Sequence, residues 1–418
     1  MKKIIIGVFA AVVFLSGCGS SSDKIKLTFW HAMADPKDKV LKELITGFEK
    51  ENTDIKITPQ YVGNYDVLLQ KLLASVAAGN SPDISQVYEN WTTRFVEEKS
   101  IIPVEKYFSK DPDRKKDLAD IYPVFIRNNS YEKTLWTFPF NKSIYVYYYN
   151  ESLFKKEGLT PPKTVAEFLN VCTKLTKRDA SGKTVRYGFG FRANIDIFAI
   201  LLYMNKGSFF NESETKSTFN DAAGRETLQF ITDLYNKYKV AVYTKDYLDG
   251  DFKAGRMASF ISTSPHRSYL ESDIGTAFSV GIAPLYAGKI KTAPIAGTNI
   301  AIFAKKENSQ KREEACYKFI KWLSNSENNV KWAMGTSYLP IRKSALTSPV
   351  MVEHLKKKPL DLIGIKELDN AVTDPRVKCW QEVRIYIGEA LEKVLLKKAT
   401  PQEALDEAAK KVDALLEK

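Results

Sequence analysis

Short apolar runs alternate with segments of helical spacing from residue 24 onward. The runs predict strands at Ile25 to Trp30, Ile55 to Val62 and Ile84 to Tyr88. Apolar residues every three or four positions predict one helix after Asp35-Pro36, which we expect to supply its N-cap and first-turn proline, and another over Tyr65 to Ala78. This alternation predicts a mainly parallel sheet, with ligand-facing loops at the carboxyl ends of the strands.

The α/β pattern continues through the middle of the chain. Further helices are predicted after Thr164 and over Asp221 to Lys239. The C-terminal third is predicted to be wholly helical, and Thr400-Pro401-Gln402-Glu403 has the spacing of a capping box at the start of the last helix. The further predicted strands are Ser143 to Tyr149, Met257 to Ser262, Phe278 to Ala283 and Ile300 to Ala304.

The N-terminus is typical of an export signal. Lys2 and Lys3 precede an apolar run, Ile4 to Leu15, that is too short to span a bilayer, so residues 1–17 are predicted to be a cleaved signal peptide. The string Leu15-Ser16-Gly17-Cys18 resembles a bacterial lipobox, in which the cysteine becomes the lipid-carrying N-terminus. An ordinary signal peptide with an incidental cysteine is the alternative. Residues 18–23, rich in glycine and serine, then read as a solvated tether.

Length and charge narrow the class of protein. A chain of 418 residues exceeds what one hydrophobic core usually supports, so two lobes are expected. The formal net charge is +12, and loss of Lys2 and Lys3 with the signal lowers it to +10. Such a surplus can indicate nucleic acid or an anionic ligand, but the export signal argues against nucleic acid and the lysines are scattered. We interpret most of them as a solvated surface.

Cysteines and histidines give no metal or cofactor signal. Apart from Cys18, the cysteines are Cys172, Cys316 and Cys379. Their odd number and the absence of CxxC spacing exclude a disulfide framework and a cysteine metal site. Cys172 and Cys316 are predicted to be buried free thiols, although one disulfide among the three stays open. The histidines, at positions 31, 266 and 354, are too far apart in sequence to suggest a metal site.

Two segments have the appearance of nucleotide loops. Gly188 to Ala193 matches GxGxxA, but no clear helix follows it and it lies deep in the chain. Gly250 to Met257 resembles a degraded phosphate loop, with Arg256 and Met257 where lysine and serine or threonine are required. Neither segment is predicted to bind a nucleotide.

Several motifs resemble those of one protein family along nearly the whole chain. They are Thr28-Phe29-Trp30-His31, Gly63-Asn64-Tyr65, Gly79-Asn80-Ser81-Pro82-Asp83-Ile84, Val87-Tyr88-Glu89, Pro139-Phe140-Asn141, Gly250-Asp251-Phe252 with Gly255-Arg256-Met257-Ala258, Tyr338-Leu339-Pro340 and Val383-Arg384-Ile385. The chain is similar to the family 1 extracellular solute-binding proteins, and within them to the subunits of ABC importers that bind glycerol-3-phosphate and glycerophosphodiesters.

The resemblance implies a type II periplasmic-binding-protein fold, an α/β architecture with two discontinuous lobes joined by a hinge. It assigns residues 24–139 and 263–304 to the first lobe and residues 140–262 and 305–418 to the second. The crossing segments it implies are Trp136 to Asn141, Ile261 to Ser264 and Phe303 to Lys306.

The same resemblance implies a ligand site between the lobes. It places Tyr65 and Glu89 at the glycerol end of the ligand. At the phosphate end it places Ser143, Ser264, the backbone around Gly297, Tyr338 and Arg384. The residue types suit this chemistry, because a carboxylate accepts from hydroxyls while hydroxyl, N–H and guanidinium groups donate to phosphate oxygens. Packing roles for the tyrosines and an interior ion pair for Arg384 are the alternatives.

One loop departs from the glycerophosphate subfamily. Where its members carry tryptophans that stack on the ligand, this chain has Phe191 and Arg192. Phe191 remains a candidate apolar wall. A carbohydrate is therefore the alternative ligand, with ring faces supplied by Trp30, Trp91, Trp136 and Phe140.

These expectations describe an exported, lipid-anchored, monomeric receptor on the periplasmic or outer face of the membrane. Its expected partners are a glycerophosphate-type solute or sugar and the transmembrane subunits of an ABC permease, with no cofactor, metal or nucleic acid. It is not expected to be an enzyme. A secreted glycoside hydrolase that uses two carboxylates is the alternative from another class.

Overall fold

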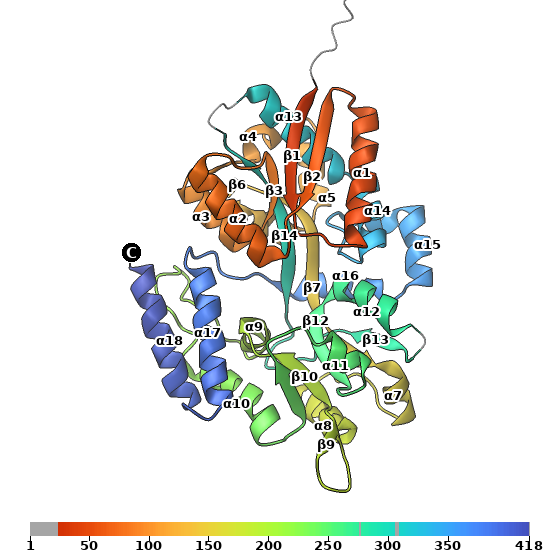
Figure 1. Cartoon of the computed structure of the whole chain (residues 1–418), viewed down its shortest axis with the longest axis vertical. Helices are drawn as coiled ribbons and strands as arrows, with labels where there is room; N and C mark the ends of the chain where they lie inside the picture. The colour runs from red at the N-terminus through yellow and green to blue at the C-terminus, as the bar shows by residue number, and fades with distance from the viewer. Residues whose placement is uncertain (1–23, 276, 306–308, 418) are drawn as a thin grey trace, which may run out of the picture.

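The computed structural model describes residues 24–275, 277–305 and 309–417. The predicted signal peptide, Cys18 and the tether to residue 23 lie outside this part. The described chain forms two lobes, one above the other in Figure 1, that are connected by two long strands. None of the helices in the described residues has the length and apolar character needed to cross a membrane.

A single mixed sheet of 11 strands extends through both lobes. Along its main path the strands are β11 (Ala241–Thr244), β10 (Phe189–Arg192), β12 (Ser259–Thr263), β7 (Phe138–Asn150), β14 (Ala293–Phe303), β3 (Ile84–Val87), β1 (Ile25–His31) and β2 (Ile55–Tyr61). Off this path, β13 (Val280–Ala283) pairs with β7, while β4 (Ile101–Ile102) and β15 (Ala371–Val372) pair with β14. The outer pairs β1–β2, β1–β3, β10–β11 and β10–β12 are parallel, but β7 and β14 run antiparallel to most of their neighbours. The sheet is therefore mixed and less parallel than the sequence pattern predicts.

Strands β7 and β14 belong to both lobes. Residues 138–144 of β7 pair with β14, and residues 145–149 pair with β12. In β14, residues 299–302 pair with β3. Both strands are longer than predicted, because the polar stretches 141–143 and 297–299 interrupt their apolar runs and look like loops in the sequence. Within the fold these polar residues are buried at the junction of the lobes.

The helices of the first lobe pack around β1, β2 and β3. They are α1 (Lys37–Glu51), α2 (Tyr65–Ala78), α3 (Glu89–Glu97), α13 (Gln310–Leu323) and α14 (Ser326–Thr336). The predicted bounds of α2 are confirmed, and the Asn64 side chain accepts from Val67 N at 3.0 Å to cap it. The predicted N-cap of α1 is wrong, because the Asp35 carboxylate makes no cap bond and instead lies near Lys39 in solvent.

The helices of the second lobe surround β10, β11 and β12. They are α8 (Val165–Leu175), α9 (Ile195–Met204), α10 (Ala222–Asn236), α17 (Trp380–Leu395) and α18 (Pro401–Leu416). The capping box of α18 is confirmed, with Thr400 and Glu403 bonded reciprocally. Helix α9 was not predicted, because it is apolar on nearly every side and has no amphipathic period.

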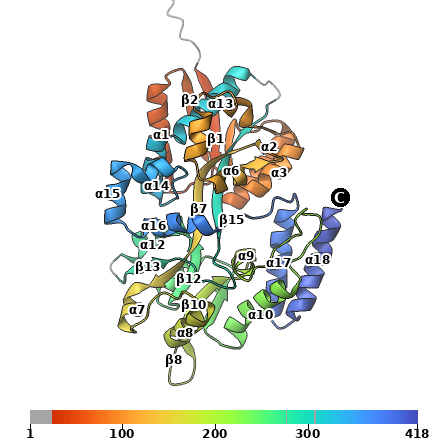
Figure 2. The same ribbon diagram turned by 180° about the vertical axis from the view of Figure 1, so that it is seen from behind.

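The C-terminal third is divided between the lobes. Helices α13 and α14 pack on α1, and α13 also packs on β1, so both lie with the first lobe, as Figure 2 shows from behind. Helices α17 and α18 pack on α10 of the second lobe. The predicted boundary assigned all of residues 305–418 to the second lobe. The stretch also contains β15, so it is not wholly helical.

Short elements complete the described chain. The helices are α4 (Glu105–Phe108), α5 (Arg114–Asp120), α6 (Pro123–Asn129), α7 (Glu151–Lys156), α11 (Asp249–Lys253), α12 (Arg267–Ile274), α15 (Pro349–Lys357) and α16 (Asp361–Lys366). Two hairpins pair β5 (Ser130–Tyr131) with β6 (Thr134–Leu135) and β8 (Lys177–Arg178) with β9 (Thr184–Arg186). Three 3₁₀ turns span Ser264–His266, Lys343–Thr347 and Glu367–Asn370. Cys172 and Cys316 are buried free thiols, as predicted, and Cys379 is also free.

Glycines in the apparent nucleotide loop serve packing. A Cβ on Gly188 would lie 2.1 Å from the carbonyl oxygen of Cys172, and one on Gly190 would lie 2.1 Å from the sulfur of Met257. Contrary to expectation, a helix does follow this loop, since α9 begins at Ile195. The glycines nevertheless face the interior of the second lobe, and this explains them without a nucleotide.

Candidate functional site

A cavity of about 310 Å³ lies between the two lobes. Residues from both lobes and from the connecting strands line it. Of the seven residues predicted to contact ligand, the six in its lining are Tyr65, Glu89, Ser143, Gly297, Tyr338 and Arg384. These residues are up to 319 positions apart in the chain, so the fold alone brings them together.

Ser264 is the exception. It lies in the 3₁₀ turn after β12 and is absent from the cavity lining, while its neighbour Thr263 is present. The Ser264 hydroxyl is buried without a hydrogen-bond partner, and its Cβ lies 3.3 Å from where a Cβ on Gly364 would stand. Thr263 ends β12 and Ser264 begins the turn, so a shift of one residue in the Ser262-Thr263-Ser264 run moves the predicted contact out of the cavity lining.

The first-lobe wall is aromatic with one buried carboxylate. Tyr65 begins α2, and its ring makes an edge contact with Tyr88, with centroids 5.0 Å apart; Tyr88 contacts Trp91 in the same way, also at 5.0 Å. Glu89 begins α3, and only 6% of it is exposed. Its Oε2 has no hydrogen-bond partner. An acceptor-only group without a donor is suited to the hydroxyls of a ligand.

A buried polar network joins β3 to the connecting strands β7 and β14 behind the residues that line the cavity. The Gln86 amide donates to Asn141 Oδ1 at 2.9 Å and to Thr298 Oγ1 at 3.0 Å, and Thr298 also bonds Asn141. Asn141 in turn donates to the Tyr65 hydroxyl at 3.1 Å. The network connects the strands that join the lobes to a predicted ligand-contacting side chain.

Gly297 requires glycine for two reasons. Its φ is +88°, and a Cβ there would lie 1.9 Å from the Asn141 carbonyl oxygen. The register of β14 against β7 also shifts beside it, between Thr298 and Asn299. The extra residue at this shift is Phe140 on β7, and Gly297 on β14 lines the cavity close by, where a backbone contact to ligand is predicted.

The second-lobe wall carries ionic groups. Arg384 on α17 pairs with Asp196 on α9 at 2.8 Å. Although burial disfavours the charge of Arg384, Asp196 and Asp374 outweigh it and raise its pKa. Burial acts on Asp196 as well, yet Arg384 lowers its pKa. Arg384 thus makes the ion pair that was its alternative role, and it still lines the cavity.

Asp374 is the most perturbed carboxyl of the lining. Burial raises its pKa to about 7, and the nearby Glu89 carboxylate adds to the rise. It lies on the segment that leads from β15 to α17. A group that titrates near neutral pH in a cleft is typical of a functional site.

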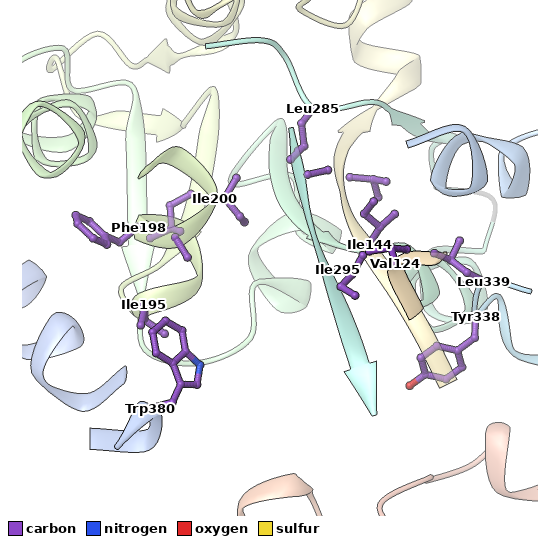
Figure 3. Packing of buried hydrophobic residues seen from close by; sticks show 14 of the residues in the cluster. Val124, Ile144, Ile195, Phe198, Ile200, Leu285, Ile295, Tyr338, Leu339 and Trp380 are labelled. Atoms are coloured by element: carbon purple, nitrogen blue, oxygen red, sulfur yellow. The ribbon is translucent and has the colours of Figure 1, made fainter. Parts of the chain in front are cut away.

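The aromatic residues proposed for a sugar are mostly elsewhere. Phe140 stacks on Trp332 at 4.6 Å inside the core, and only Trp91 of the four predicted ring faces lines the cavity. Phe191 is 2% exposed and packs inside the second lobe, so it is not a cavity wall. Trp380, which was not predicted, does line the cavity; Figure 3 shows Ile295 between it and Tyr338.

Sequence reasoning missed most of the second-lobe lining. The missed residues are Tyr145, Asn194, Asp196, Tyr247, Asp374 and Trp380. Tyr145 lies on β7, and the others lie on loops and at helix starts with no shared motif. Arg192 alone gave a signal in the sequence, because it departs from the residue of the subfamily at that loop, and it does line the cavity. The described residues contain no group of three or more His, Cys, Asp or Glu side chains arranged to hold a metal ion.

Comparison with known proteins decides the family. The model of the bacterial extracellular solute-binding protein family matches residues 43–359. The chain belongs to this family. The expected resemblance is therefore confirmed, and the two-lobed fold is that of its members.

The solute-binding protein has full-length relatives. It is 30% identical to the sn-glycerol-3-phosphate-binding periplasmic protein UgpB of Pectobacterium atrosepticum, over 97% of this chain and 95% of the relative. It is 29% identical to UgpB of Escherichia coli K12, over 100% of this chain and 98% of the relative.

Solved structures share the fold. UgpB from Mycobacterium tuberculosis in complex with glycerophosphocholine superposes with a TM-score of 0.82 at 20% identity, covering 94% of this chain and 98% of that one. An ABC substrate-binding protein from Listeria monocytogenes in complex with cycloalternan gives 0.83 at 22% identity, covering 94% and 99%. At these identities the structures bear on fold alone.

Proposed function

We propose that this chain is the solute receptor of an ABC importer and captures glycerol-3-phosphate or a glycerophosphodiester between its lobes. Full-length similarity to glycerol-3-phosphate-binding proteins supports the ligand class. The observation that carries the proposal is the cavity between the lobes. It gathers six separately predicted residues, with a carboxylate acceptor on one wall and guanidinium groups on the other.

The ligand would act by joining the lobes. Tyr65 and Glu89 come from helices of the first lobe, and Arg384 comes from α17 of the second. A solute that contacts both walls binds the closed arrangement more tightly than the open one, so it shifts the population toward the closed form. The permease then distinguishes loaded from empty receptor by shape. No step of this cycle requires chemistry on the solute, and we propose a monomeric binding protein without catalysis.

A saccharide is the second candidate ligand. Tyr88, Trp91, Tyr145 and Trp380 line the same cavity, and aromatic faces are typical of sugar sites. The Listeria protein, in complex with cycloalternan, shows that this fold can hold a saccharide. The two candidates differ in charge, which makes them separable by a ligand panel.

A thermal-shift panel tests the proposal. The probes are glycerol-3-phosphate, glycerophosphocholine, inorganic phosphate and maltotriose. A ligand at 100 times its dissociation constant stabilises the native state by about 2.7 kcal/mol. We expect the two glycerol esters to raise the melting temperature and to be recovered intact. A shift with maltotriose alone would transfer the assignment to the saccharide class, and turnover of any probe would favour an enzyme.

Membrane anchoring through Cys18 is part of the proposal. It rests on the lipobox-like string at the end of the signal sequence. A Cys18→Ala precursor that is lipidated and retained in the membrane like the parent would refute this part.

A further inference from the structure

Charge on the cavity wall decides which ligands it accepts. Four carboxylates line the cavity, from Asp66, Glu89, Asp196 and Asp374, against the guanidinium groups of Arg192 and Arg384. Protonation of Asp374 near neutral pH reduces this excess but leaves three acids. A doubly charged phosphate ester therefore needs a guanidinium whose charge is available to it.

The charge of Arg384 is already paired within the protein. It forms an ion pair with Asp196 at 2.8 Å, and Asp374 adds a second carboxylate to its surroundings. A phosphate at Arg384 alone would have to share that guanidinium with an ionised Asp196. In a desolvated site this repulsion is costly.

Arg192 is differently placed. It ends β10, and its guanidinium lies over the ring of Tyr247, 4.7 Å from the ring centroid. Its Nε is buried and has no hydrogen-bond acceptor. Asp196 interacts with Arg192 electrostatically, but in the described part of the chain no carboxylate forms an ion pair with Arg192 as Asp196 does with Arg384. The Tyr247 ring fixes the orientation of the guanidinium without consuming its donors.

We propose that Arg192, held over Tyr247, binds the phosphate group of the ligand and makes the cavity selective for phosphate esters over neutral solutes. This inference rests on the proposed function and adds a residue to the predicted site. Asp196 lies near both guanidinium groups, so the phosphate is bound on the wall where Arg192 and Arg384 face the cavity. Tyr247, 72% exposed, is available to cover the ligand there.

The test compares Arg192 variants in calorimetric titrations. Arg192→Ala removes the guanidinium, and Arg192→Lys keeps the charge without the planar fork. The control, Arg256→Ala, removes an equal charge just after α11, in the same lobe but outside the cavity. The probes are glycerol-3-phosphate, glucose-6-phosphate, glucuronate and maltotriose. We expect Arg192→Ala to weaken glycerol-3-phosphate about tenfold to a hundredfold, Arg192→Lys to recover part of that loss, and Arg256→Ala to change nothing. The melting temperature of ligand-free Arg192→Ala should stay near that of the parent.

Each other outcome is decisive. Unchanged glycerol-3-phosphate affinity in Arg192→Ala overturns this inference and leaves the proposed function standing. A parent that binds glucose-6-phosphate but not glycerol-3-phosphate, with the affinity lost in Arg192→Ala, supports the phosphate site and overturns the proposed ligand. Selective binding of glucuronate or maltotriose by the parent overturns both. A lowered melting temperature with equal losses for all probes would make Arg192 a structural residue and refute the inference.

Discussion

Burial of polar groups in the cavity prepares single residues to bind a ligand and lowers the stability of the empty protein. Glu89 has an oxygen without a donor, Arg192 has a donor without an acceptor, and Asp374 has a raised pKa. Each would be better solvated outside the protein, so each is a cost to the empty receptor. A ligand with hydroxyls and an anionic group supplies the missing partners.

Asp374 gives a prediction about pH. Its folded pKa, about 7, is above the ordinary value of 3.8. The folded state therefore holds this proton between about pH 4 and pH 7, so stability falls as the pH rises over this range and the loss is complete once the pH has passed 7. Asp374→Asn should stabilise the ligand-free protein by about 1–3 kcal/mol at pH 8 and by little at pH 4. Chemical unfolding at both pH values measures this, with the exposed Asp246→Asn as control; equal effects at the two pH values would contradict it.

At the scale of elements, two strands and one glycine place the site. The pairing of β7 with β14 places Ser143 opposite Ala296 and Gly297 opposite Lys142. The polar network of Gln86, Asn141 and Thr298 fixes this junction from inside. The packing against Asn141 and the left-handed φ both require glycine at position 297, and this residue brings the backbone of β14 to the cavity.

Gly297→Ala tests the role of this glycine. The new Cβ would collide with the Asn141 carbonyl and force a left-handed φ on alanine, so we expect a loss of about 2–4 kcal/mol in unfolding free energy and weaker ligand binding. Gly388→Ala on α17 is the matched control, because nothing lies within 4 Å of its Cβ. That helical variant should be stabilised by up to about 1 kcal/mol. A Gly297→Ala protein as stable as the parent would show that β14 accommodates the new Cβ, which would contradict this role.

The same elements show what sequence patterns can predict. The bounds of α2 and the cap of α18 follow from local signals, namely Asn64, Thr400 and Glu403. The full length of β7 and the whole of α9 do not, because their residues are selected by tertiary burial and break the usual periods. For the site, motif resemblance located six lining residues. Asp196 and Asp374 have no local signal, since their positions depend on how α9 and the segment before α17 pack together on one wall of the cavity.

At the scale of the whole molecule, polar contacts outside the two strands also connect the lobes. Lys37 of α1 reaches across to the Pro265 carbonyl at 3.3 Å and lies over Tyr269. Arg376, on the segment before α17, donates to the carbonyls of Arg127 and Ser130. The binding free energy of a ligand can outweigh contacts of this kind. This suits a receptor that changes the angle between its lobes.

We propose above all that both lobes bind one anionic solute at the same time. Calorimetric titration of glycerol-3-phosphate into the parent, Glu89→Gln and Arg384→Lys tests it most directly, with the exposed Glu43→Gln as control. We predict one site in the parent, a loss of about 1–3 kcal/mol of binding free energy in each cavity variant, and no change in the control. Absence of binding in the parent, or a loss confined to one lobe's variant, would contradict the account.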